Sequence, residues 1–162
     1  LHGLRCLALR FGIVHGLGPV FKTDPHFMTA PNKFCRQVAR GEPISVFGGG
    51  RAPAGWLALP DAVNASIAAV ACADWSGYTP VNVVGEVASV AQVAATVRDL
   101  ARSRDLPTHI EGIADDDLYD PAGGFTVASR LAALPAARPT RTLRDTLPAV
   151  LDRCVAEVRG EK

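Results

Sequence analysis

An almost continuous apolar run occupies residues 6–16 and reads CLALRFGIVHG. An exposed antiparallel strand would alternate apolar and polar positions, so this run is typical of a strand buried on both faces of a parallel sheet. The residues after Arg10 would leave the sheet at the carboxyl end of the strand, where ligands bind in open parallel sheets. We therefore expect residues 10–16 to border a binding site, and an ordinary turn after a core strand is the alternative.

Three later segments have the β-branched and aromatic content of short strands, residues 44–47, 56–59 and 81–84, and residues 108–110 are a fourth candidate. The three glycines at 48–50 end the first of these segments, because glycine accepts a positive φ. No Lys-Ser or Lys-Thr pair follows them and no helix opens there. The glycines are therefore not expected to cradle a phosphate group.

Helical spacing of apolar positions alternates with these strands, which favours an α/β fold. Ser89 precedes one helical pattern as an N-cap, and Thr142 with Asp145 approximates a capping box at the start of another. Pro148 conflicts with a regular helix there, so that helix should either kink or begin near Thr146. The predicted helices cover about residues 31–40, 60–72, 90–101, 126–134 and 142–159.

Composition narrows the class of protein. With 162 residues, of which 48% are hydrophobic, the chain can bury a core of one domain or slightly more. A net charge of +1 gives no reason to expect nucleic acid or a membrane surface as a partner. The apolar stretches are interrupted before they reach the length of a membrane span, and no secretory signal pattern opens the sequence.

The cysteines and the acidic residues do not form a metal-binding pattern. Four cysteines lie far apart without a C-x-x-C pair, at positions 6, 35, 72 and 154, which indicates reduced thiols in a cytoplasmic protein. Asp115, Asp116, Asp117 and Asp120 do not have the spacing of a calcium loop. We expect a solvated acidic loop there and no metal site.

The segment LRFGIVHGLGP resembles the strand and loop of pattern L-R-[YF]-x-N-[VI]-[YF]-G-P in extended short-chain dehydrogenase/reductases, the family of NAD-dependent sugar epimerases and dehydratases. Four later segments resemble later parts of that family in the same order: ARGEPISVFGGG, WLALPDAVNASIAAV, VNVVGEVASVAQVAATV and ASRLAALPAARPTRTLRDTL. The resemblance implies the C-terminal part of an extended Rossmann-type α/β protein, with a few short strands and about five helices. The N-terminal dinucleotide-binding half is absent from the sequence. Residues 1–20 would be the last strands and loop of the Rossmann-type sheet, and residues 21–162 a substrate-binding subdomain.

The resemblance also implies site residues. The backbone of Gly12 and Ile13 would approach the cofactor, whereas His15, Ser45, Phe47 and Arg51 would contact the substrate. Phe47 would stack on the nucleotide base, and a buried core phenylalanine is the alternative. Asp61 matches an aspartate of the family, and an acid at the start of a helix has a structural role through the helix dipole.

The sequence departs from the family at two phosphate-binding positions. Ile13 stands where the family has an asparagine near the sugar diphosphate, and Ala54 where it has an arginine that clamps phosphate. Only Arg51 could replace that charge, and the R-x-G-D turn of the family is not evident. Each lost charge-assisted contact typically weakens binding about tenfold or more. A less phosphorylated or non-nucleotide substrate is therefore an alternative to a nucleotide sugar.

The catalytic pattern of the family is missing. Neither Tyr78 nor Tyr119 has a lysine four residues later, and no glycine-rich G-x-x-G-x-x-G turn occurs. We therefore expect a substrate-binding part that is not catalytic alone, with NAD(P) bound only in the intact enzyme. The alternative is a pseudoenzyme or a remnant binding or oligomerisation module without turnover. The apolar strand at residues 7–14 would keep an unpaired edge, which predicts a homodimer or pairing with an upstream half.

Overall fold

The computed structural model describes residues 3, 5–22, 24–72, 77–114, 126–131 and 135–160. Within these ranges the chain forms four α-helices, seven strands and three short 3₁₀ helices. The strands are β1 (Cys6–Phe11), β2 (Ile13–His15), β3 (Ile44–Ser45), β4 (Pro53–Ala58), β5 (Tyr78–Val83), β6 (Glu86–Ser89) and β7 (Ile110–Glu111). The helices are α1 (Ala30–Ala39), α2 (Leu59–Ala71), α3 (Val90–Arg102) and α4 (Leu143–Arg159), with η1 (Pro25–Phe27), η2 (Gly48–Gly50) and η5 (Pro135–Ala137).

The strands form three small sheets. β1 runs parallel to β5, β4 lies between parallel β2 and antiparallel β6, and β3 runs parallel to β7. Parallel strands need long crossover connections, which here contain the helices. The predicted α/β class is therefore confirmed.

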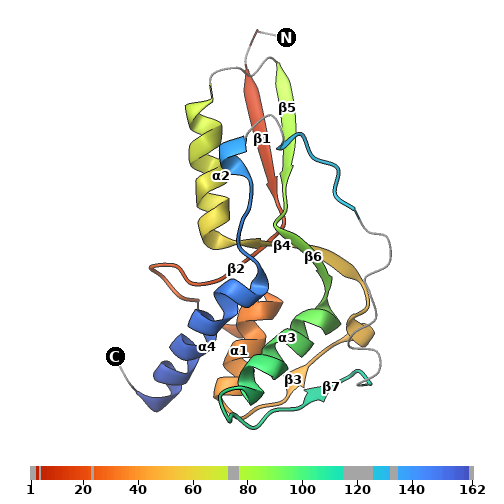
Figure 1. Ribbon diagram of the computed structural model, residues 1–162, viewed down its shortest axis with the longest axis vertical. Coiled ribbons are helices and arrows are strands. Elements are labelled where there is room, and N and C mark those ends of the chain that lie inside the picture. The colour runs from red at the N-terminus through yellow and green to blue at the C-terminus, as the bar shows by residue number, and fades with distance from the viewer. Residues whose placement is uncertain are drawn as a thin grey trace.

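Two hydrophobic clusters divide the molecule into regions that occupy opposite ends of it (Figure 1). The strand region consists of β1, β5, α2 and η5, and Ala62, Ala65, Val81 and Val83 lie at its centre. The helical region consists of α1, α3, α4, β3 and β7, around a larger cluster that includes Val97, Leu147 and Leu151. β2 and β4 cross the molecule between the two regions (Figure 1).

Side-chain caps define the helix starts that the sequence predicted. Ser89 accepts a hydrogen bond from the backbone of Gln92, whose side chain accepts one in return, and Thr142 makes the same capping box with Asp145. Because this box stabilises the first turn of α4, the helix begins at Leu143 and includes Pro148. The alternative start near Thr146 is therefore wrong. Glu86 on β6 also accepts a hydrogen bond from the backbone N–H of Leu143.

The apolar run at residues 6–16 ends its first strand at Phe11, close to where the sequence predicted that the chain leaves the sheet, but the predicted burial of that strand on both faces is wrong. It is divided into β1 and β2 at Gly12, where a Cβ atom would lie 2.7 Å from the carbonyl oxygen of Gly55. Phe11 and Ile13, on either side of that crossing, are 42% and 40% exposed. The reason is that, among the described residues, β1 has only β5 as a neighbouring strand.

Two other predictions need correction. The strand predicted for residues 44–47 ends at Ser45, and Phe47 precedes η2 instead. The helix predicted for residues 126–134 is absent from residues 126–130, and residues 132–134 lie outside the described part. The Asn82 side chain on β5 donates a hydrogen bond to the carbonyl of Ala128, and the Asn82 carbonyl accepts one from the Ser129 hydroxyl, so this segment is bonded to the strand. The described chain therefore has four α-helices where about five were predicted.

Candidate functional site

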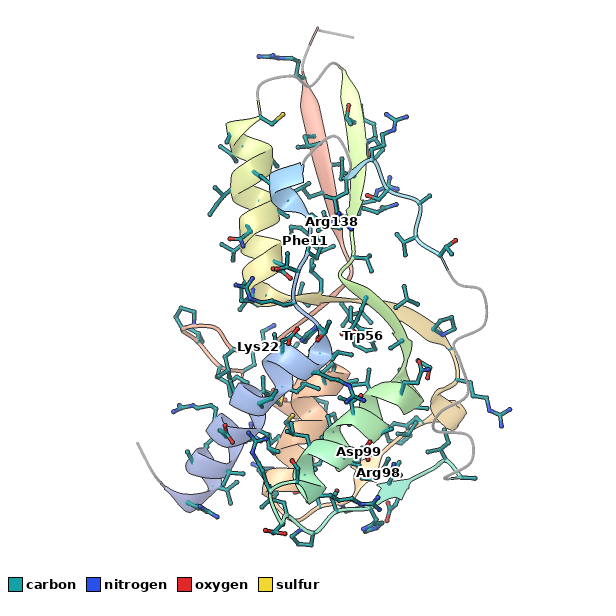
Figure 2. The ribbon with its side chains drawn as sticks, in the orientation of Figure 1. Phe11, Lys22, Trp56, Arg98, Asp99 and Arg138 are labelled. Carbon is teal, nitrogen blue, oxygen red and sulfur yellow. The ribbon has the colours of Figure 1, made fainter. Side chains whose placement is uncertain are left out.

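A cavity of about 370 Å³ lies at the carboxyl end of β2. β2 and the beginnings of α1 and α2 form one side of it, and the loop between β2 and α1, which carries Lys22 (Figure 2), forms the other. Ligands of parallel sheets bind at this end of the strands, so the cavity is where the sequence predicted a site. It is lined by Val14, His15, Gly16, Gly18, Val20, Phe21, Lys22, Phe27, Met28, Thr29, Asn32 and Leu59.

Hydrogen bonds hold the rim of this cavity in shape. The Asn32 side chain accepts from the Gly16 N–H at 3.1 Å and donates to the Gly16 carbonyl at 2.9 Å. The Thr29 hydroxyl donates to the Val14 carbonyl at 3.0 Å. These bonds join the start of α1 to the end of β2, so the base of the loop is fixed on both sides.

His15 is a polar residue in the wall of the cavity and is only 2% exposed. Its Nδ1 atom lies 3.0 Å from the hydroxyl of Thr146 on α4. Burial lowers the pKa of His15 to about 4, although the negative charge of Asp61 acts in the opposite direction. The imidazole is therefore neutral near pH 7 and can exchange hydrogen bonds without carrying a charge.

Asp61 is buried near His15, but its carboxylate accepts hydrogen bonds from other residues. One carboxylate oxygen accepts from the backbone N–H groups of Thr140 and Arg141 at 3.0 and 2.8 Å, and the other accepts from the Arg141 guanidinium at 2.7 Å. Asp61 does not line the cavity. Its contacts attach the start of α2 to the segment before α4, which agrees with the structural role expected for it.

Phe47 lies on the surface and is 80% exposed, so the alternative of a buried core phenylalanine is wrong. The ammonium group of Lys33 on α1 lies 5.8 Å from the centroid of its ring. An exposed ring with a cation above it is a surface on which a planar aromatic group can stack. Ser45, two residues earlier, exchanges two hydrogen bonds of 3.4 Å with the side chain of Gln37.

The structure separates the predicted site residues into two groups. His15 lines the cavity, whereas Ser45, Phe47 and Arg51 do not. Position 12 needs a glycine because β4 passes too close there, at Gly55, for a Cβ atom. Ile13, the next residue, is half-exposed. The first turn of α1 lies between the groups, because Asn32 lines the cavity and its neighbour Lys33 lies over Phe47.

Sequence reasoning missed three residues of this site. Lys22 precedes the helix predicted for residues 31–40 and lies in none of the predicted elements, and Asn32 lies in the first turn of that helix. Thr146 is 131 residues from His15 in the sequence, so no local pattern could connect them. Lys22 is the charged side chain of the cavity lining among the described residues.

The described part of the chain contains no candidate metal site, no disulfide and no candidate membrane-spanning helix. There, no group of three or more histidine, cysteine, aspartate or glutamate side chains is arranged to hold a metal ion. Asp115, Asp116, Asp117 and Asp120 lie outside the described residues. The four cysteines are free thiols. None of the described helices is both long and apolar enough to span a membrane.

No protein-family model matches the sequence, and no curated protein matches it. Solved structures nevertheless share its fold. UDP-glucuronic acid 4-epimerase from Bacillus cereus, in complex with NAD, superposes with a TM-score of 0.71 at 19% identity over 96% of this chain and 45% of that chain. UDP-glucose 4-epimerase from Thermotoga maritima, with UDP-glucose, superposes with a TM-score of 0.69 at 17% identity, over 96% of this chain and 47% of that chain.

MoeE5, in complex with UDP-glucuronic acid and NAD, gives a TM-score of 0.65 at 24% identity over 94% of this chain and 47% of that chain. This chain therefore spans less than half the length of each of these three structures. At these identities the match establishes the fold. The chain has the fold of the C-terminal half of NAD-dependent epimerases, as the sequence motifs predicted.

Proposed function

We propose that this chain is the substrate-binding part of an NAD-dependent epimerase/dehydratase-like enzyme that acts on a nucleotide sugar. The observation that supports it most is the cavity at the carboxyl end of β2, in a fold shared with epimerases named for UDP-glucose and UDP-glucuronic acid. A cavity of about 370 Å³ falls within the range of small-molecule sites.

In this proposal the two groups of site residues bind different parts of the ligand. The base stacks on the exposed ring of Phe47 under Lys33, and the sugar enters the cavity beside His15. The diphosphate passes the first turn of α1, near the positive charge of Lys33. Arg51 and Ser45 lie on the Phe47 side and contribute polar contacts to the nucleotide.

Catalysis then depends on the part of the fold that this chain does not cover. Each described helix begins without a preceding glycine-rich turn; α2, for example, follows β4 directly at Leu59. A dinucleotide pyrophosphate needs such a turn at a helix N-terminus, so the described residues do not fit NAD(P). In the intact enzyme the cofactor would supply hydride transfer, and this chain would bind and orient the substrate.

The exposed edge of β1 and the outer face of α2 are the surface that we assign to the dinucleotide-binding half. Val63, Ile67 and Val70 point outward from α2 at helical spacing and are 48%, 62% and 89% exposed. A second copy of this chain is the alternative partner for the same surface. We place the assembled enzyme in the cytoplasm.

Calorimetry with UDP tests the assignment of the base. We expect Phe47→Ala to weaken UDP binding about tenfold, since stacking of a base on an aromatic ring contributes about 1–3 kcal/mol. Tyr78→Ala is the matched control, because Tyr78 is also an exposed aromatic residue but lies on β5 in the strand region, whereas Lys33 lies over Phe47. NAD should show no micromolar binding to this chain.

Two results would contradict the proposal. One is the absence of any binding of UDP or UDP-glucose at millimolar concentration. The other is equal affinity of Phe47→Ala and the unmodified chain for UDP.

A binding or oligomerisation module without turnover is the second candidate. Ile13 and Ala54, at positions where the resembled family has phosphate-binding side chains, favour it. The gene sequence upstream of Leu1 separates the two candidates. A glycine-rich turn and a Tyr-x-x-x-Lys pair there support the enzyme, and their absence supports the module.

A further inference from the structure

The two ring nitrogens of His15 have different surroundings. Nδ1 faces the hydroxyl of Thr146, and Nε2 has no hydrogen-bond partner among the described residues. The buried side-chain nitrogen and oxygen atoms without a partner in that part of the chain are Arg104 Nη1 and Thr108 Oγ1. Since Nε2 is not among them, it keeps some accessible surface. His15 is 2% exposed and lines the cavity, so that surface faces the cavity.

The Thr146 hydroxyl determines which ring nitrogen carries the proton. Its oxygen lies 3.2 Å from the carbonyl oxygen of Thr142, 3.4 Å from that of Leu143 and 3.0 Å from His15 Nδ1. A carbonyl only accepts, and the hydroxyl has a single hydrogen. All these contacts are favourable only when the hydroxyl donates to the carbonyls and accepts from Nδ1–H. Nε2 then has a free lone pair.

We propose that Thr146 is a positioning residue that holds His15 in the Nδ1–H tautomer, so that Nε2 accepts a hydrogen bond from an uncharged hydroxyl group of a ligand in the cavity. In the proposed function, on which this step rests, the hydroxyl belongs to the sugar of a nucleotide sugar. A phosphate oxygen has no hydrogen to donate at neutral pH and would face the lone pair of Nε2. The inner end of the cavity therefore selects a hydroxyl over a phosphate.

Two further observations agree with this assignment. The neutral state of His15 keeps Nε2 unprotonated, because burial opposes a second proton and Arg141 already pairs with the nearby carboxylate of Asp61. The polar side chains Asn32 and Thr29 in the wall of the cavity are engaged with backbone groups. Lys22, in the loop, is the cationic group of the lining and suits the anionic part of the same ligand.

The ¹⁵N NMR spectrum of His15 without ligand tests the positioning role. We expect a single Nδ1–H tautomer in the unmodified chain and a mixture of tautomers in Thr146→Val. Thr96→Val is the matched control, because the Thr96 hydroxyl makes the same bond to the carbonyl four residues earlier, at 2.9 Å, whereas the contact with His15 Nδ1 comes from Thr146. A proton on Nε2 in the unmodified chain, or an unchanged tautomer in Thr146→Val, overturns the proposal.

Titration with UDP-glucose and with UDP tests the ligand. UDP-glucose should shift the Nε2 resonance and UDP should not, and Thr146→Val should bind UDP-glucose about tenfold more weakly with unchanged affinity for UDP. If UDP-glucose binds without moving the Nε2 resonance, the hydroxyl contact is wrong. If neither ligand binds, the nucleotide-sugar function is contradicted, and the tautomer measurement alone decides the role of Thr146.

Discussion

α2 and α3 are helices of equal length, 13 residues each, in the two regions of the molecule, and they bury different faces. α3 places Val93, Ala94, Val97 and Ala101 in the helical region and turns polar residues such as Asp99 and Arg102 outward. α2 buries mainly the small residues Ala62 and Ala65. Its larger apolar residues Val63, Ile67 and Val70 face outward.

Among the described residues, α3 therefore buries its larger apolar side chains in the helical region, whereas α2 leaves its own exposed on the strand region. An exposed β-branched stripe on a helix, next to a strand that pairs with a single strand in the described part of the chain, is typical of a surface that another chain or domain covers. The chain spans less than half of the structures that share its fold, which agrees with this interpretation. Substitutions in the two regions should therefore differ in what they change.

The largest effect should follow truncation of the helical core. Leu147 is fully buried on α4. Leu147→Ala removes packing contacts and leaves a cavity, so we expect the free energy of unfolding in urea to fall by about 2–5 kcal/mol. A loss below about 1 kcal/mol would contradict tight packing of the helical region around Leu147.

The junction between the regions should respond to pH through His15. Its pKa is about 4 in the folded chain, below the ordinary value of 6.5, so between these pH values the unfolded chain binds a proton that the folded chain does not. Stability should therefore fall as the pH is lowered from about 6.5 to about 4, by up to roughly 3 kcal/mol. Urea unfolding at several pH values measures this loss.

His15→Phe is the comparison for that measurement, because phenylalanine keeps a ring of similar size but cannot take up a proton. The pKa of Glu86 is raised by burial, which makes stability change with pH in the opposite direction, but Glu86 is present in both chains. Only the difference between them reports on His15. Parallel pH profiles of the two chains would show that His15 is not the responsible group.

A smaller loss should follow removal of the Asp61 carboxylate at the same junction. Asp61→Ala removes the acceptor of two part-buried hydrogen bonds, from the N–H groups of Thr140 and Arg141, so we expect a loss of about 1–2 kcal/mol. The Arg141 side chain is 43% exposed and loses little, because water replaces its partner. Asp61→Asn keeps one acceptor oxygen, and in urea unfolding it should lose less than the alanine variant.

The smallest effect on stability should come from the exposed stripe of α2. Ile67→Ser combined with Val70→Ser should change the free energy of unfolding by at most about 0.5 kcal/mol, because both side chains already face solvent. The same double variant should reduce self-association of the chain at micromolar concentration in sedimentation velocity. Arg102→Glu on the outer face of α3 is the control and should leave self-association unchanged.

Slow amide exchange along β1 in a strictly monomeric chain would contradict this last expectation. It would show that the edge of β1 is covered within the chain and that the strand region needs no partner.

The order and type of most elements followed from the sequence by itself. Local signals were sufficient where a short stretch contains all the interacting groups, as in the capping boxes of Ser89 with Gln92 and Thr142 with Asp145. Five motifs that occur in the same order as in one protein family were sufficient to predict the α/β fold class. Leu147, Val150, Leu151 and Cys154 follow helical spacing in the sequence and are buried on α4, whereas Val158 is 51% exposed.

Only the tertiary structure decided which residues are exposed and which residues come together at the site. Pattern cannot distinguish a strand that is buried in a complete sheet from β1, which pairs only with β5 among the described residues, because an apolar run is expected in both cases. Phe47 has the sequence context of a core strand, and only the end of β3 at Ser45 places it on the surface. His15 and Thr146 meet across 131 residues, because Asp61 and Glu86 hold the start of α4 beside β2 and β4. Contacts between such distant residues depend on packing geometry, which no local pattern records.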